Sequence, residues 1–195
     1  MASRSKQSEI PSVELLEAEL NKERHKTSYG RALRSTVFSL LVVAAVAVLV
    51  AVLFLPVLEI SGTSMTPTLA EGDVVVSVKG RNFRPGDVVA FYYNNKILVK
   101  RAVAGSGAWV DISEDGTVYV NNVPLEEPYV SDRALGQCDI ELPYQVPENR
   151  LFVMGDHRDV SVDSRSTAVG CVAEDQIVGK IVFRVWPFSD FGWVR

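Results

Sequence analysis

Hydrophobic and polar positions divide the chain into three parts. Residues 1–34 are mostly polar, residues 35–58 carry no charged side chain, and residues 59–195 mix short apolar runs with turn residues. The core of the middle part, Leu40 to Leu55, contains only Leu, Val, Ala and Phe. Because a helix that crosses a bilayer needs about 20 apolar residues, we expect a transmembrane helix over 35–58, a tail before it and one folded domain after it.

Two other interpretations of the apolar segment are less favoured. A buried helix of a soluble protein is rarely apolar all round over such a length. A cleaved leader has a short basic start and an apolar region of about 7–15 residues. Here a tail of about thirty residues comes first, and no small-residue cleavage site follows. The pattern therefore favours a membrane anchor in the lipid bilayer.

The charges beside the segment predict its orientation. The side toward the N-terminus is basic and the far side begins with carboxylates; the residues are Lys22, Arg24, Lys26, Arg31 and Arg34 against Glu23, and then Glu59, Glu71 and Asp73. The positive-inside rule predicts a single-pass protein of the cell membrane, with the tail in the cytoplasm and residues 59–195 outside it. For the tail itself, Val13, Leu16 and Leu20 leave a short helix and a solvated segment both open.

The part after the anchor has the pattern of strands. Short β-branched and aromatic runs are separated by Gly, Pro and Asn, and they cover residues 73–78, 87–93, 96–103, 117–120, 150–154 and 176–186. Asn94-Asn95 and Asn121-Asn122 are typical of two-residue hairpin turns. A more polar stretch at about 111–147 suggests an inserted β lobe. We expect an all-β domain with several sheets and no βαβ units.

Composition excludes several classes of protein. The net charge of −4 and the lack of a basic stripe outside the tail give no sign of nucleic acid binding. Two cysteines and two histidines exclude a disulfide framework and make a metal centre improbable. Cys138 and Cys171 allow one disulfide at most, and Cys171 could equally fill the core.

Ser64, just beyond the anchor, is a candidate nucleophile that needs a base. The predicted orientation puts His25 across the bilayer, which leaves His157, a carboxylate, or a lysine made neutral by burial. On a strand, Lys100 shares its face with Leu98 and Ala102, an environment that disfavours the charged ammonium. Alone, each signal is weak.

The segments around these residues resemble, in the same order, the conserved boxes of bacterial type I signal peptidases, the Ser-Lys leader peptidases of peptidase family S26. They are Ile60–Leu69 with Glu71-Gly72-Asp73, then Val99-Lys100-Arg101, then Gly155–Arg158 through Ser161–Arg165; the lobe segment from Asp115, Glu127-Pro128-Tyr129 and Trp186-Pro187-Phe188 are also similar. The resemblance runs from about residue 36 to 195 and is nearest to the Gram-positive type.

The resemblance implies a role for each matched residue. Ser64 corresponds to the nucleophile, Lys100 to its general base, and Ser161 to a hydroxyl that orients the lysine. Asp163 and Arg165 correspond to a pair that braces the site. Met65 is an adaptable apolar neighbour of the nucleophile, suited to the bilayer surface or a small substrate side chain. Gly62 stands where some relatives carry a serine that donates to the oxyanion, so that the second donor is a backbone group, Ser61 or Thr63.

The sequence departs from the family pattern at two places. His157 stands where bacterial members usually carry Asn, a position that the resemblance makes structural. After the lysine box, residues 104–109 keep glycines but lack the usual Pro and Asp.

The implied activity is removal of N-terminal signal peptides from exported preproteins, after small residues in an Ala-x-Ala-like pattern, with no metal or cofactor. A specialised pilin-type signal peptidase stays open as an alternative. So does a catalytically silent membrane assembly factor, although Ser64 and Lys100 are both present. A self-cleaving repressor-type protease would lack the anchor.

Overall fold

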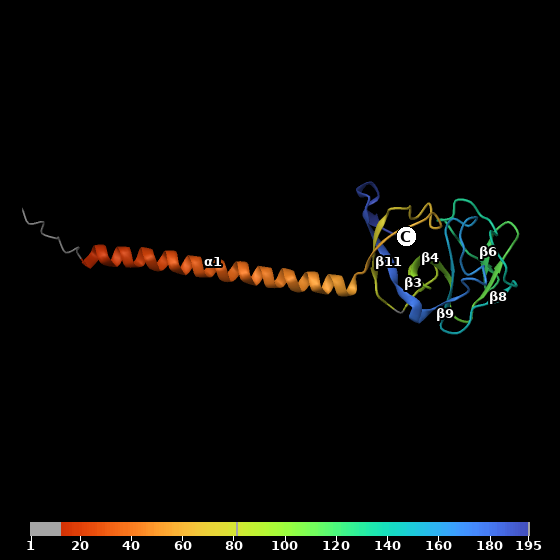
Figure 1. Cartoon of the computed structure of the whole chain (residues 1–195), viewed down its shortest axis with the longest axis horizontal. Helices are drawn as coiled ribbons and strands as arrows, with labels where there is room; N and C mark the ends of the chain where they lie inside the picture. Colours follow the sequence, from red (N-terminus) through yellow and green to blue (C-terminus); the bar gives the residue numbers. More distant parts are fainter. Residues whose placement is uncertain (1–12, 81, 195) are drawn as a thin grey trace, which may run out of the picture. The chain divides into compact units, whose positions relative to one another are not determined.

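The computed structural model describes residues 13–80 and 82–194, and the chain divides into two units after Ala51. Helix α1 (Val13–Phe54) forms the described part of the first unit and ends just beyond it (Figure 1). Its 42 residues span about 63 Å at 1.5 Å each, roughly twice the hydrocarbon core of a bilayer. Within it, the segment Ala32–Ala51 has a mean hydropathy of 2.3 and is long and apolar enough to cross a membrane.

Helix α1 differs from the predicted anchor at both ends. It ends at Phe54 rather than at Leu58, because Pro56 lacks an N–H donor and disfavours helical geometry at the residue before it. Toward the N-terminus, the helix runs without a break from Val13, so the described part of the tail is helical. Of its apolar residues there, Val13 and Leu16 are 71% and 50% exposed.

The second unit is built of antiparallel strands in two sheets, which confirms the all-β prediction. The larger sheet has the order β1-β2-β11-β3-β4-β9-β10, with β12 paired to β11, and the smaller has the order β7-β6-β5-β8. The larger sheet comprises β1 (Val57–Glu59), β2 (Val74–Val78), β3 (Val88–Tyr93), β4 (Lys96–Ala104), β9 (Arg150–Met154), β10 (Val172–Ala173), β11 (Ile177–Trp186) and β12 (Gly192–Trp193). The smaller comprises β5 (Trp109–Ile112), β6 (Val118–Val120), β7 (Val123–Pro124) and β8 (Tyr144–Gln145), and the 3₁₀ turns are η1 (Glu174–Gln176) and η2 (Phe188–Asp190).

Both predicted Asn-Asn hairpins are present. Tyr93 pairs with Lys96 across the first turn, where Asn94 has a φ of 51°. In the second turn, Asn121 and Asn122 have φ values of 53° and 64°. Asn tolerates this left-handed conformation better than other residues with a Cβ, which explains why these two dipeptides mark the turns.

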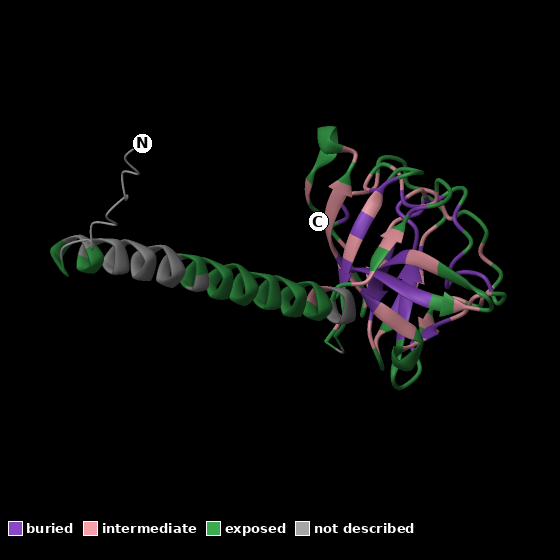
Figure 2. Cartoon of the chain, turned by 60° about the vertical axis from the view of Figure 1, so that its left-hand side comes forward, coloured by how far each residue is buried: buried purple, intermediate pink, exposed green. Residues whose placement is uncertain are grey.

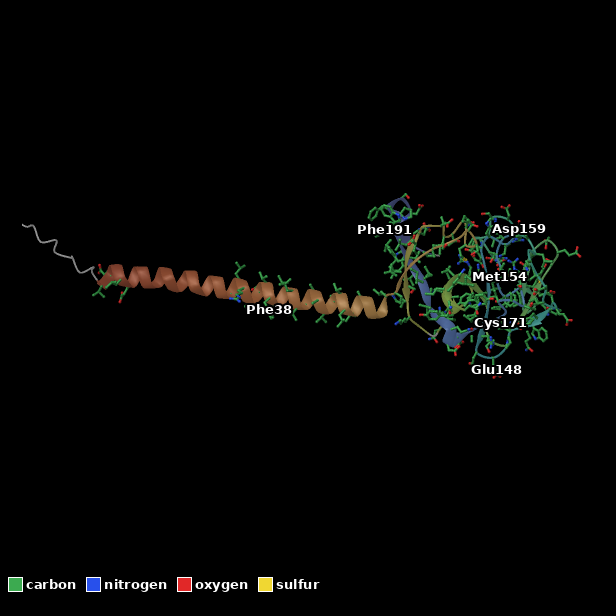
Figure 3. The ribbon with its side chains drawn as sticks, viewed as in Figure 1. Phe38, Glu148, Met154, Asp159, Cys171 and Phe191 are labelled. Carbon is green, nitrogen blue, oxygen red and sulfur yellow. The ribbon has the colours of Figure 1, made fainter. Side chains whose placement is uncertain are left out.

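Three groups of buried side chains hold the second unit together (Figure 2). One joins the two sheets and includes Phe152, Met154 and Cys171, the last two labelled in Figure 3. Cys138 and Cys171 are both free thiols, and Cys171 is 6% exposed within this core. The structure therefore favours the core-filling role of Cys171 over a disulfide.

Candidate active site

The segment that carries Ser64 is a loop between β1 and β2, anchored at both ends. Ile60 and Asp73 close it through a backbone hydrogen bond of 2.8 Å, and Gly72 N–H donates to the Ile60 carbonyl at 2.9 Å. Met65 and Leu69 are 2% and 0% exposed and pack into the core below the loop. The buried side chains of Met65 and Leu69 and the hydrogen bonds at the ends of the loop therefore fix the position of the half-buried Ser64.

Lys100 lies on β4 opposite Val89 of β3 and is 4% exposed. Its Nζ lies 2.6 Å from Ser64 Oγ, within hydrogen-bond distance. Burial lowers the pKa of the Lys100 ammonium from 10.5 to about 8. The nearby charge of Arg165 lowers this pKa further, whereas Asp163 and Asp156 raise it. The structure thus brings Ser64 and Lys100 together and favours a neutral amine at mildly alkaline pH.

A small cavity lies beside this pair, and we call it the Ser64 pocket. Its volume is about 100 Å³, well below the roughly 300–1,000 Å³ of pockets for drug-sized ligands. It is lined by residues 58–62, Ser64, Met65 and residues 97–100. The ladder between β4 and β9 begins only at Arg101, so residues 97–99 pair with β3 alone. The pocket therefore borders a strand segment with one free edge.

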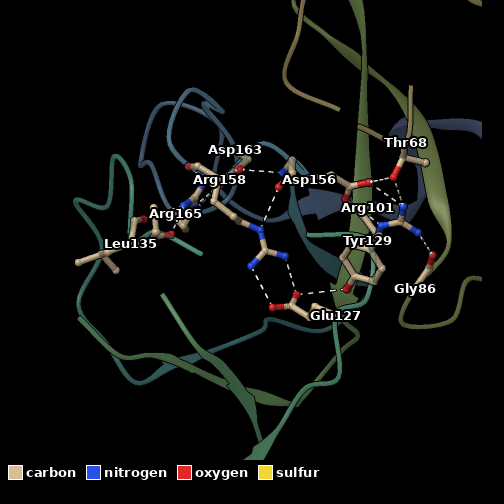
Figure 4. A network of polar contacts seen from close by, with 12 residues as sticks. Thr68, Gly86, Arg101, Glu127, Tyr129, Leu135, Asp156, Arg158, Asp163 and Arg165 are labelled. Carbon is tan, nitrogen blue, oxygen red and sulfur yellow. Dashed lines mark hydrogen bonds and ion pairs between the residues drawn. The ribbon is translucent and has the colours of Figure 1, made fainter. Parts of the chain in front are cut away.

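Buried ion pairs connect residues 156–165 to β4 and to the segment between β7 and β8 (Figure 4). Asp156 accepts two hydrogen bonds from Arg101, at 2.8 and 2.7 Å, and one from Thr68 Oγ1 at 2.5 Å. The Arg101 guanidinium also lies 3.8 Å from the centre of the Tyr129 ring. Since Arg101 follows Lys100 on the strand, these contacts restrain the lysine backbone from the opposite face of β4.

Two further buried pairs involve Arg158 and Arg165. Arg158 donates to the Glu127 carboxylate at 3.0 and 2.5 Å. Arg165 pairs with Asp163 at 2.9 Å, and Asp163 also accepts from the Gly155 N–H at 2.9 Å. All four side chains are almost fully buried, and such pairs hold geometry rather than add much net stability.

Ser161 is buried, but its Oγ has no hydrogen-bond partner among the described residues. The contact with Lys100 that the resemblance implies is therefore not formed in this structure. Gly155 packs tightly here: a Cβ built on it would lie 2.5 Å from the Ser64 carbonyl oxygen and closer still to Ser161 Oγ. The glycine thus permits the close approach of the Ser161 and Ser64 segments.

His157 contacts the nucleophile loop, but within the described residues no hydrogen bond joins its ring to Ser64 Oγ or Lys100. The backbone N–H of His157 donates to the Ser64 carbonyl at 3.1 Å, and its ring Nδ1 lies 3.0 Å from Thr66 Oγ1. This geometry agrees with a structural role for the residue that replaces Asn.

The groups around Ser64 suggest where a developing oxyanion would bind. Within the described chain, no hydrogen bond engages the Ser64 N–H. Gly62 has a φ of 86° and is exposed, as are Ser61 and Thr63, and a Cβ built on it would meet nothing within 4 Å. No cluster of metal-ligating residues occurs in the described parts of the chain.

Sequence reasoning missed the partners of the arginines. The sequence contains Glu127 and Tyr129 only as part of a family-like lobe segment, and nothing in their spacing shows that they pack against Arg158 and Arg101. Gly155 is also missed as a packing position. In the sequence, Gly155-Asp156 and the apolar strand that contains Lys100 indicate where the site lies. They do not indicate which residues pair with the arginines.

Comparison with known proteins assigns the family. The family model described as signal peptidase, peptidase S26, matches residues 33–186. Signal peptidase IB of Staphylococcus aureus (strain COL) is 40% identical over an alignment of 152 residues, and the match covers 68% of this chain and 78% of the relative. Thylakoidal processing peptidase 1 of Arabidopsis thaliana, a chloroplast protein, is 36% identical over an alignment of 167 residues. This match covers 75% of this chain and 47% of the relative.

A crystal structure of a signal peptidase I from Enterococcus faecalis V583 is 29% identical, with a TM-score of 0.42 over 51% of this chain and 96% of that one. The family model covers both the apolar part of α1 and nearly all of the β unit, and the curated relatives agree with it. The chain belongs to the signal peptidase family, peptidase S26.

Proposed function

We propose that this protein is a membrane-bound serine endopeptidase that removes N-terminal signal peptides from exported preproteins, with Ser64 as nucleophile and Lys100 as general base. The observation that carries this proposal is the 2.6 Å contact between Ser64 Oγ and a buried Lys100 Nζ. A catalytically silent relative would have no need to keep a costly buried lysine at this distance from a serine.

The reaction follows from the chemistry of the two groups. Neutral Lys100 takes the Ser64 proton while Oγ attacks the substrate carbonyl carbon, and the Ser64 N–H donates to the oxyanion. The C–N bond then breaks, and the leaving amine takes the proton from the Lys100 ammonium. Lys100 next deprotonates a water that attacks the ester carbonyl. The C–Oγ bond then breaks, the Lys100 ammonium returns the proton to Ser64 Oγ, and the signal peptide leaves with a new carboxyl terminus.

The Ser64 pocket supports a preference for small side chains before the cleaved bond. An extended substrate could pair with the free edge of residues 97–99, as in strand addition. Side chains would then alternate toward and away from the surface, so that the first and third residues before the bond share one face. A cavity of about 100 Å³ suits Ala-like groups at these positions.

Membrane attachment is supported by α1 and by exposed aromatic side chains of the β unit. Trp186, Phe188, Phe191 and Trp193 are 50–74% exposed, and Phe191 is labelled in Figure 3. Tryptophan is enriched where proteins meet the membrane interface. We place the tail in the cytoplasm and the β unit outside it, on the charge asymmetry around α1.

The test is cleavage of a preprotein by the full chain in detergent, followed by N-terminal sequencing of the product. Wild type should release the mature protein with a single new N-terminus after a small residue, and Ser64→Ala should not. A preprotein with Leu in place of the small residue before the bond should resist cleavage. Cleavage by Ser64→Ala, or indifference to the Leu substitution, would contradict the proposal.

A further inference from the structure

A second cavity borders the nucleophile loop, and we call it the His157 pocket. Its volume is about 170 Å³, and it is lined by Thr66, Pro67, Ser131, Asp132, Asp156 and His157. The Ser64 pocket is lined by residues 58–62 and 64–65 of the loop and its flanks and by β4, whereas this one is lined by the next two loop residues, by residues 131–132 and by residues 156–157. Successive parts of the nucleophile loop therefore line the two cavities, and the change from one to the other falls between Met65 and Thr66.

The His157 pocket lies within reach of a substrate held at Ser64. Its lining residue Thr66 is two positions from Ser64, and His157 N–H donates directly to the Ser64 carbonyl. An extended peptide advances about 3.3 Å per residue. If the residues before the cleaved bond occupy the Ser64 pocket, the first or second residue after the bond can reach the His157 pocket.

Hydrogen bonding fixes which atoms of His157 are available. Thr66 Oγ1 has one proton, which it donates to the Thr63 carbonyl at 2.8 Å. At the 3.0 Å contact Thr66 Oγ1 must therefore accept, and His157 Nδ1 must donate. In neutral His157 this leaves Nε2 with its lone pair, as a hydrogen-bond acceptor.

The two carboxylates of the pocket differ in their availability. Asp156 is 1% exposed and is occupied by Arg101 and Thr68. Asp132 is exposed and has no hydrogen-bond or ion-pair partner among the described residues. The lining thus offers one free carboxylate and a histidine acceptor, with no cationic side chain among its members.

We propose that the His157 pocket is a subsite for the mature-protein side of the substrate, which takes a side chain that donates hydrogen bonds or carries positive charge, and that Asp132 determines this preference. The inference rests on the proposed peptidase function and deepens it. It assigns substrate recognition to residues after the cleaved bond, in addition to the small residues before it.

The test compares peptides that differ only at the first or second residue after the bond, with Lys, Gln, Ala or Glu there. For wild type in detergent, kcat/KM should be higher with Lys than with Glu at one of these positions. In Asp132→Asn this ratio should fall about threefold, the size typical of an exposed ion pair. The matched control is Glu126→Gln, an exposed carboxylate of the same lobe outside the pocket lining, which should keep the wild-type ratio.

Two results would overturn the subsite. One is a wild-type enzyme that cleaves the Lys and Glu peptides equally at both positions. The other is a preference that Asp132→Asn leaves unchanged, or that Glu126→Gln reduces equally. The Ala peptide separates this failure from that of the proposed function, since its cleavage by wild type and not by Ser64→Ala depends on the nucleophile alone.

Discussion

Replacing Lys100 with Met should abolish cleavage and yet stabilise the fold. The pKa of Lys100 falls from 10.5 to about 8 on folding, a shift that corresponds to about 3 kcal/mol of destabilisation when the lysine is protonated in both states. Loss of the Lys100–Ser64 hydrogen bond costs about 1 kcal/mol. The expected net gain in the free energy of unfolding is therefore about 2 kcal/mol at pH 7.

The size of the stability gain of Lys100→Met changes with pH in a defined window. Below pH 8 the folded protein holds a buried ammonium, and the penalty is complete. Between pH 8 and 10.5 the folded lysine is neutral while the unfolded one still binds a proton, so the penalty shrinks; above 10.5 it is gone. The advantage of Lys100→Met should shrink over the same window.

The free energies of unfolding of wild type and Lys100→Met can be compared at pH 7 and pH 10.5 by guanidinium unfolding of the full chain in nonionic detergent, followed by tryptophan fluorescence. The control is Lys96→Met, an exposed lysine on the same strand, which should show no such pH-dependent gain. A Lys100→Met protein that is less stable than wild type at pH 7, or whose gain persists undiminished at pH 10.5, would refute the reasoning.

Three other predictions concern the rate, the packing and the topology. The kcat/KM should rise about tenfold per pH unit and level off near pH 8 as Lys100 loses its proton. The His157→Asn variant should show the same rise with pH and a rate within about tenfold of wild type. A loss of several orders of magnitude in this variant would give His157 the role of the base. Gly155→Ala should destabilise the fold by about 1–3 kcal/mol and impair cleavage, whereas Gly192→Ala, with nothing within 4 Å of the new Cβ, should do neither; equal unfolding midpoints for both variants would exclude the packing argument. Protease added outside intact cells should digest residues 59–195 and spare a tag at Met1, and an accessible tag would reverse the orientation.

Much of the β fold could be predicted because its strands carry local signals. The β-branched runs and the Asn-Asn turns locate β2, β3, β4, β9 and β11 to within a residue or so. Strands β1, β8, β10 and β12 have only two or three residues each and exist through pairing with a neighbour. No local pattern marks such strands, since they depend on contacts distant in sequence.

The candidate site was predictable for a different reason. Burial of Lys100 follows from its apolar neighbours on one face of the strand, and the family resemblance places Ser64 beside it. The partners of Arg101 and Arg158 depend on how the lobe folds back over β4 and β9, which sequence spacing does not show. Ser161 shows the limit of the resemblance, because its hydroxyl has no partner among the described residues.

The most direct test of the central claim is a double-mutant comparison of the proposed dyad. We expect Ser64→Ala and Lys100→Ala each to remove essentially all cleavage of a preprotein in detergent, and the double variant to be no worse than either, because two residues that act as one unit lose their effect once. Unfolding curves for each variant confirm that the fold is intact. Appreciable turnover by a folded Lys100→Ala protein, or a double variant much slower than both single variants, would contradict the Ser64–Lys100 mechanism.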